Sequence, residues 1–124
     1  MEPLRVLIVD DEEELVSTLV ERLDIRGIHA HGVTTGREAL ACLQDQVFDV
    51  VLLDVKMPEI GGLEVIKEIK ARLPDLEVIL LTGHGSDEDA KKGIELGAFE
   101  YIIKPFNLSA LIDVLHRAAG RDVL

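Results

Sequence analysis

The sequence predicts an α/β fold with a parallel five-stranded sheet and helices on both faces, and three observations support this. Apolar runs of strand length alternate five times with longer segments whose apolar residues recur at helical spacing. Three of the runs are apolar nearly throughout, which is typical of strands covered on both faces. Four runs end at a polar side chain, and a parallel sheet gathers such endings at one edge. The chain of 124 residues fits a single domain spanning 1–124, with a core expected over about 4–119.

The first strand is expected over residues 4–10 and the first helix over 12–26. Asp11 and Glu14 have the spacing of a capping pair at the start of that helix, and Gly27 lies where it should end. One stripe of the helix carries apolar residues three and four positions apart and should pack on the sheet: Leu15, Val16, Leu19, Val20 and Leu23.

The next strands are expected over 28–33 and 49–54, with helices over 36–46 and 62–72. The run 28–33 contains two histidines and a glycine, so it suits an edge of the sheet. The run 49–54 is wholly apolar from Val50 to Leu53, just before Asp54, and therefore belongs in the middle.

The last strands are expected over 77–82 and 99–103, with helices over 86–96 and 107–119. The fifth run carries Glu100 and Tyr101, which suit the opposite edge of the sheet. The boundaries of the fourth helix are indicated by three residues: Ser86, Asp89 and Gly97.

Right-handed crossovers give these strands the order 2-1-3-4-5, the doubly wound (βα)5 order of a flavodoxin-like three-layer sandwich. The chain reverses its direction of winding between the first and third strands, and a crevice opens at that switch point. Asp10, Asp11 and Asp54 end the two strands that flank it. We therefore expect the functional site there.

The composition argues against several classes of function and location. A formal net charge of -11 argues against direct binding of nucleic acid by this domain, because such binding depends on lysines and arginines that neutralise phosphates. Cys42 is the only cysteine, so an intrachain disulfide is excluded and a reducing cytoplasm is the expected location. No apolar run approaches the ~18 residues of a membrane span, so no membrane association is expected.

Carboxylates that converge on one crevice repel one another unless a cation lies among them or a proton is shared. Hard oxygen ligands are the preferred ligands of Mg²⁺, so Asp10, Asp11 and Asp54 are the candidate metal ligands. Acids are also favoured at a helix N-terminus by its dipole, and this explanation suffices for Glu12, Glu13 and Glu14. It does not account for Asp54, which no helix follows directly.

Lys104 and Thr82 end the fifth and fourth strands and should reach the same crevice. Pro105 restricts Lys104 to extended backbone and so fixes where its side chain leaves the chain. An ammonium group at this edge can neutralise carboxylates or hold a phosphoryl group, and the Thr82 hydroxyl can donate a hydrogen bond there.

Four motifs in register over essentially the whole chain resemble the receiver domain of two-component response regulators, of the chemotaxis-regulator-like kind. They are Val9-Asp10-Asp11-Glu12, Leu53-Asp54-Val55-Lys56-Met57-Pro58 with Gly61-Gly62, Leu81-Thr82-Gly83, and Tyr101-Ile102-Ile103-Lys104-Pro105-Phe106.

The resemblance implies that Asp54 is a phosphoacceptor, taking a phosphoryl group from a sensor histidine kinase or a phosphotransfer protein. It implies that Mg²⁺ is ligated by Asp11, Asp54 and the main-chain carbonyl of Lys56, and by Asp10 through water. Thr82 would bind the phosphoryl group and Tyr101 would move from an exposed to a buried rotamer. The domain would be a signalling module rather than an enzyme acting on other substrates.

The resemblance also implies that phosphorylation switches a partner surface formed by the fourth helix, the fifth strand and the fifth helix. An output domain, a downstream protein or a second copy would dock there. Lys56 and His84 occupy positions that vary in the family and are expected to influence dephosphorylation. The loop Thr82-Gly83-His84-Gly85 resembles receivers attached to transcriptional activators.

Two alternatives belong to other classes. A small Mg²⁺-dependent aspartyl phosphohydrolase would use similar residues, but haloacid dehalogenase-like enzymes place two acids two positions apart after the first strand. Here the acids Asp10 and Asp11 are adjacent. A receiver-like interaction module without phosphorylation is the other alternative, and the complete set of acids, hydroxyl and lysine argues against it.

Overall fold

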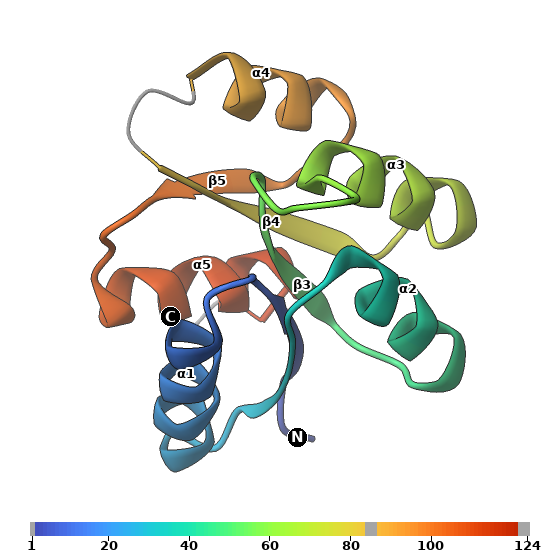
Figure 1. Ribbon diagram of the computed structural model, residues 1–124. Helices are drawn as coiled ribbons and strands as arrows, with labels where there is room; N and C mark the ends of the chain where they lie inside the picture. The colour runs from blue at the N-terminus through green and yellow to red at the C-terminus, as the bar shows by residue number, and fades with distance from the viewer. Residues whose placement is uncertain (1, 84–86, 122–124) are drawn as a thin grey trace.

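The computed structural model describes residues 2–83 and 87–121, which form one five-stranded parallel sheet between two layers of helices (Figure 1). The strands are ordered β2-β1-β3-β4-β5, as the sequence predicts. Their bounds are β1 Arg5–Val9, β2 His29–Val33, β3 Val50–Asp54, β4 Glu77–Thr82 and β5 Glu100–Ile103. The helices are α1 Glu13–Ile25, α2 Gly36–Asp45, α3 Gly62–Arg72, α4 Asp87–Glu95 and α5 Leu108–Ala118.

Alternation of side chains along the buried strands divides the core into two layers. In β1, Val6 and Ile8 face the layer covered by α1 and α5, whereas Leu7 and Val9 face the layer covered by α2 and α3 (Figure 1). The stripe expected on α1 packs in the first of these layers, with Val16, Leu19 and Leu23 buried and Leu15 and Val20 partly buried. The strands predicted as central are those with almost completely buried residues.

Parallel register brings the carboxyl ends of the strands to one edge. Val9 of β1 lies opposite Leu53 of β3, and Asp54 lies opposite Leu81 of β4. The residues that follow β1 therefore lie beside the end of β3, at the point where the winding reverses.

The observed helix boundaries agree with the prediction at two C-terminal glycines and differ from it at the start of α1. Gly27 and Gly97 have φ values of 78° and 111°, the left-handed conformation that favours glycine after a helix. Asp11 does not cap α1: the helix begins one residue later, its N-cap is Glu12, and no side chain caps it. The Asp11 carboxylate belongs instead to the acidic cluster at the sheet edge. The second predicted capping pair, Ser86 with Asp89, is not described, because Ser86 lies outside the described part of the chain.

No helix among residues 2–83 and 87–121 is long and apolar enough to cross a membrane.

Candidate functional site

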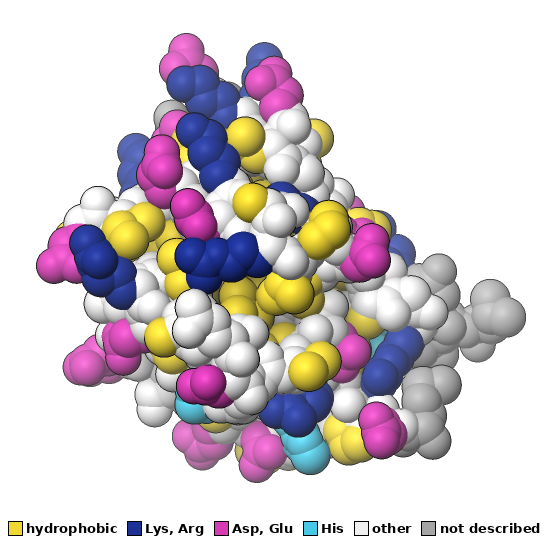
Figure 2. Space-filling model, turned by 90° about the vertical axis from the view of Figure 1, so that its right-hand side faces the viewer, with side chains coloured by type: hydrophobic (Ala, Val, Ile, Leu, Met, Phe, Trp, Pro, Cys, Tyr) yellow, Lys and Arg dark blue, Asp and Glu magenta, His cyan; other side chains and the backbone are white. Residues whose placement is uncertain are grey.

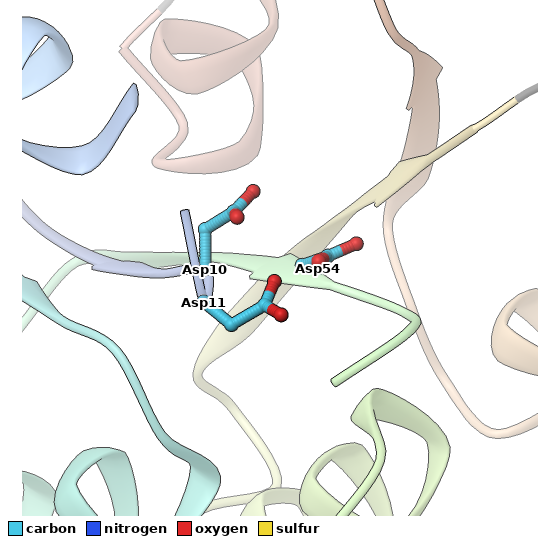
Figure 3. A group of neighbouring side chains, drawn as sticks. All are labelled: Asp10, Asp11 and Asp54. Carbon is cyan, nitrogen blue, oxygen red and sulfur yellow. The ribbon is translucent and has the colours of Figure 1, made fainter. Parts of the chain in front are cut away.

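Three aspartates meet where the ends of β1 and β3 lie side by side. Asp10 and Asp11 directly follow β1, and Asp54 is the last residue of β3. Each can offer one carboxylate oxygen such that all three oxygens lie within 4.8 Å of one another. Figure 3 shows the three side chains leaving these two neighbouring strand ends, with the carboxylates of Asp11 and Asp54 extending the same way.

The three carboxylates differ in exposure, and this sets their electrostatics. Asp10 is fully buried, Asp54 is 6% exposed and Asp11 is exposed. Burial first, and then the neighbouring charge of Asp10, raise the pKa of Asp54 to about 6 against the opposing effect of Lys104. Keeping Asp54 ionised at neutral pH therefore costs free energy that a bound cation would offset.

Lys104 is the cation that the fold brings to this cluster. Its Nζ lies 2.7 Å from Asp10 Oδ2, 3.5 Å from Glu12 Oε1 and 3.9 Å from Asp54 Oδ2. Burial alone lowers the pKa of Lys104, but the close contact with Asp10 and the charges of Asp54, Asp10 and Glu12 outweigh it, so the pKa is raised. The ammonium group is therefore charged at physiological pH. The peptide bond from Lys104 to Pro105 is cis.

Backbone amides orient two of the carboxylates. The amide of Glu12 donates to Asp10 Oδ1 at 2.9 Å, and the amide of Lys56 donates to Asp54 Oδ1 at 3.3 Å. Among the described residues, Asp10 Oδ2 is buried without a partner in good hydrogen-bond geometry, although Lys104 Nζ lies at ion-pair distance. The 2.7 Å separation makes the contact an ion pair whatever its angle, because two opposite charges attract at any orientation.

Thr82 and Tyr101 lie on the two strands beyond the acids. Thr82 ends β4 with 2% of its surface exposed, and its carbonyl accepts a 2.8 Å hydrogen bond from the Lys104 amide. Tyr101 lies on the edge strand β5, opposite Leu80 and 41% exposed. The site residues predicted from sequence thus lie at the carboxyl ends of four neighbouring strands, β1, β3, β4 and β5, whereas Tyr101 lies within β5 itself. His84 lies outside the described residues.

Sequence reasoning missed one contributor to the site, Glu12. The sequence explains Glu12 only through the helix dipole, whereas its carboxylate reaches Lys104, 92 positions away in the chain. No local pattern reports such a contact, because only the packing of the whole domain brings the end of β5 beside the start of α1.

Other hollows of the protein have a different chemistry. Two grooves of about 440 and 210 Å³ lie at the carboxyl ends of α2 and α3, lined largely by Leu43, Val47, Phe48, Ile69 and Leu73. Figure 2 looks onto the side of the molecule where α2 and α3 lie, and hydrophobic side chains surface in the middle of it among charged ones. Within residues 2–83 and 87–121, the aspartate cluster is the one group of three or more potential metal ligands.

The cluster fits a small divalent cation. Its donors are carboxylate oxygens, which Mg²⁺ prefers, and Asp10 contributes a buried oxygen with no hydrogen-bond donor in good geometry among the described residues. Three carboxylates against one lysine also leave an excess of negative charge for a cation to balance.

The fold and the cluster define a class: doubly wound α/β domains with an acidic cation pocket at the switch point of the sheet. Residues 6–116 match the family model described as the response regulator receiver domain. The chain therefore belongs to the receiver domain family of two-component response regulators.

Relatives and structures agree with this assignment. The chain is 39% identical over 114 residues to the regulatory protein AtoC of Escherichia coli strain K12, covering 92% of this chain and 25% of that protein. It is 44% identical over 108 residues to the transcriptional regulatory protein CpxR of Klebsiella pneumoniae, covering 87% of this chain and 46% of that protein. The chain thus spans only a quarter to a half of these relatives.

A crystal structure of a receiver domain protein from Clostridium thermocellum matches with a TM-score of 0.90 and 32% identity over 95% of both chains. The receiver domain of NtrX from Brucella abortus matches with a TM-score of 0.88 and 33% identity, covering 93% of this chain and 98% of that one.

Proposed function

We propose that this chain is a phosphorylation-dependent receiver in which Asp54 accepts a phosphoryl group from a phosphohistidine of a sensor histidine kinase or phosphotransfer protein. The observation that carries the proposal is the placement of a nearly buried Asp54 between two further carboxylates and a lysine, at the switch-point edge of the sheet. Family membership supports it, since receiver domains of response regulators interact with histidine kinases and output domains.

In this reaction an Asp54 carboxylate oxygen attacks phosphorus, an O–P bond forms, the N–P bond of the phosphohistidine breaks, and the imidazole retains the electron pair and takes up a proton. Phosphoryl transfer needs positioning and neutralisation of the equatorial oxygens more than covalent help. Mg²⁺, when bound, supplies that neutralisation. Asp11, Asp54 and the Lys56 carbonyl would hold the ion directly, and Asp10 through water.

The remaining roles belong to the chain's own groups. The Lys56 amide orients Asp54 by its 3.3 Å hydrogen bond. The charged Lys104 contacts phosphoryl oxygens, and Thr82 donates its hydroxyl to them from the end of β4. The Thr82 carbonyl accepts a hydrogen bond from the Lys104 amide, so movement at the end of β4 is transmitted to the end of β5.

Phosphorylation adds charge and acceptor oxygens, and it regulates by biasing an element with two arrangements. We propose that the α4–β5–α5 surface is this element and that Tyr101 exchanges between exposed and buried rotamers. Its partner is an output domain, a downstream protein or a second copy after phosphorylation. The domain is proposed as a single unit with its core at 4–119, acting in the cytoplasm, with no direct binding of nucleic acid or membrane.

Incubation with Mg²⁺ and acetyl phosphate or phosphoramidate, followed by intact mass measurement, tests the proposal. A labile phosphoryl adduct is expected in the wild type and absent in Asp54→Asn. Steady turnover of phosphate esters would instead favour an aspartyl phosphohydrolase. Absence of an adduct in a folded protein would identify a receiver-like interaction module without phosphorylation.

A further inference from the structure

Lys104 divides its contacts between the acidic pocket and a carboxylate outside it. Its Nζ is nearest to Asp10 at 2.7 Å, and Glu12 at 3.5 Å is nearer than Asp54 at 3.9 Å. Asp10 and Asp54 belong to the aspartate cluster, whereas Glu12 does not. The ammonium group is therefore nearer to Asp10 and Glu12 than to Asp54.

The backbone fixes Glu12 in the position that makes this contact. Its amide is bonded to Asp10 Oδ1 at 2.9 Å, and its carbonyl accepts the first helical hydrogen bond of α1, from the Val16 amide at 3.1 Å. As N-cap of α1 its side chain caps no backbone amide. Its carboxylate is thus free of the helix and extends to Lys104.

Glu12 and Lys104 also line a common groove of about 530 Å³, beside Leu15, Pro105 and Phe106. The groove runs along α1 as far as Arg22, between this helix and the segment that joins β5 to α5. The contact of Glu12 with Lys104 connects these two segments where the groove meets the acidic pocket.

We propose that Glu12 is a positioning residue that holds the Lys104 ammonium back from Asp54 in the unphosphorylated domain and so slows phosphoryl capture. This inference rests on the proposed function, because it assigns Glu12 an effect on that same reaction. Phosphoryl capture requires the Lys104 ammonium group to contact the new phosphoryl oxygens on Asp54. This movement lengthens the distance between Lys104 and Glu12. Exposed ion pairs are weak, so the effect on rate is about two- to fourfold.

The chain provides a matched control in Glu13, an exposed acid of the first turn of α1 that is not among the ion-pair partners of Lys104. Glu12→Gln and Glu13→Gln remove the same charge from adjacent positions. Phosphorylation by acetyl phosphate at saturating Mg²⁺ should be about two- to fourfold faster in Glu12→Gln and nearly unchanged in Glu13→Gln. The difference between Glu12→Gln and the wild type should shrink in high salt, which screens an exposed pair.

A second measurement is independent of phosphorylation. In Mg²⁺-free protein, the ammonium resonance of Lys104 in a nitrogen–proton NMR spectrum should shift in Glu12→Gln and stay in place in Glu13→Gln. Equal phosphorylation rates and unshifted Lys104 resonances in both variants would overturn the inference. The proposed function would still stand if the wild type becomes phosphorylated. A wild type that accepts no phosphoryl group, with a shifted Lys104 resonance, would instead contradict the proposed function.

Discussion

At the scale of single residues, Asp54 is the acid of the site whose pKa is strongly raised. Burial and the adjacent charge of Asp10 raise its pKa from 3.8 to about 6. Between these two pH values the folded state binds more protons than the unfolded state. The contribution of Asp54 to stability is therefore most favourable below pH 4, and it declines as pH rises from about 4 to about 6.

Asp54→Asn is expected to stabilise the Mg²⁺-free protein at pH 7.5, because the amide keeps the shape of the side chain and removes the buried charge. The free energy of unfolding should rise by about 1–2 kcal/mol, and this gain should vanish near pH 4. Urea unfolding followed by circular dichroism across this pH range measures both. A variant less stable than the wild type at pH 7.5 would show that the Asp54 charge is already compensated by Lys104.

The residues of the site differ in how far the sequence could predict them. Asp10, Asp11, Asp54 and Lys104 each follow or end a recognisable apolar run, so their meeting at one edge follows from parallel strand order. Glu12 has the same local surroundings as its acidic neighbours, and its contact with Lys104 depends on two segments that meet only in the folded domain.

At the scale of elements, the helices begin in two different ways. Thr35 and Asn107 cap α2 and α5 by accepting from the amides of Glu38 and Ala110, whereas α1 and α3 start without a side-chain cap. Among the four helices whose starts lie within the described residues, the two uncapped ones begin after the acid-bearing strands β1 and β3. At the start of α1, the Asp10 and Asp11 side chains contribute to the acidic cluster, which explains why the expected capping by Asp11 was wrong.

Thr35→Ala should therefore lower the free energy of unfolding by about 1 kcal/mol, because it removes the 3.1 Å hydrogen bond to the Glu38 amide. Asp11→Ala, made without Mg²⁺, should cause no comparable loss, since Asp11 caps nothing. Urea unfolding of the two variants side by side tests the difference. Destabilisation by Asp11→Ala equal to that of Thr35→Ala would restore Asp11 as a capping residue.

The start of α3 approaches the end of β3 so closely that a side chain has no room. A Cβ on Gly62 would lie 2.4 Å from the Asp54 carbonyl oxygen and 2.7 Å from Val55 Cα, whereas one on Gly61 would meet only the Val55 carbonyl at 3.7 Å. The sequence marks both positions as glycine, but the structure separates a required glycine from a replaceable one.

Gly62→Ala is expected to destabilise the domain by about 1–3 kcal/mol and to displace Asp54, because backbone atoms must move to relieve the contact. Gly61→Ala is the control and should cost less than about 1 kcal/mol, since its φ of -72° is accessible to alanine. Urea unfolding and the yield of phosphoryl adduct measure the two effects. Equal stability and equal yield in both variants would contradict the close approach of α3 to β3.

At the scale of the whole molecule, the formal charge of -11 and the aspartate cluster act in the same direction. Negative charge concentrated at one edge of the sheet opposes the compact state, and a cation bound there reduces the repulsion. A ligand that binds only the folded protein stabilises it by mass action.

Mg²⁺ is therefore expected to raise the free energy of unfolding, by about 1.4 kcal/mol when its concentration is tenfold above the dissociation constant. Asp11→Ala should abolish this gain while the circular dichroism spectrum stays that of the folded protein. Thermal unfolding with and without Mg²⁺ measures the change. Undiminished stabilisation in Asp11→Ala would place the ion elsewhere, and an unfolded Asp11→Ala would show that Asp11 is a structural residue.

The sequence by itself determined the order of strands and helices, the central and edge positions in the sheet, and the acids, hydroxyl and lysine that end the strands. These follow from periodicity, from the handedness of crossovers and from residue chemistry, all of which are local or general. The tertiary structure decided the burial that raises the pKa of Asp54, the contact of Glu12 with Lys104 and the clearance that Gly62 must provide. Each of these depends on distances between segments far apart in the chain, which only the packed sheet and helices fix.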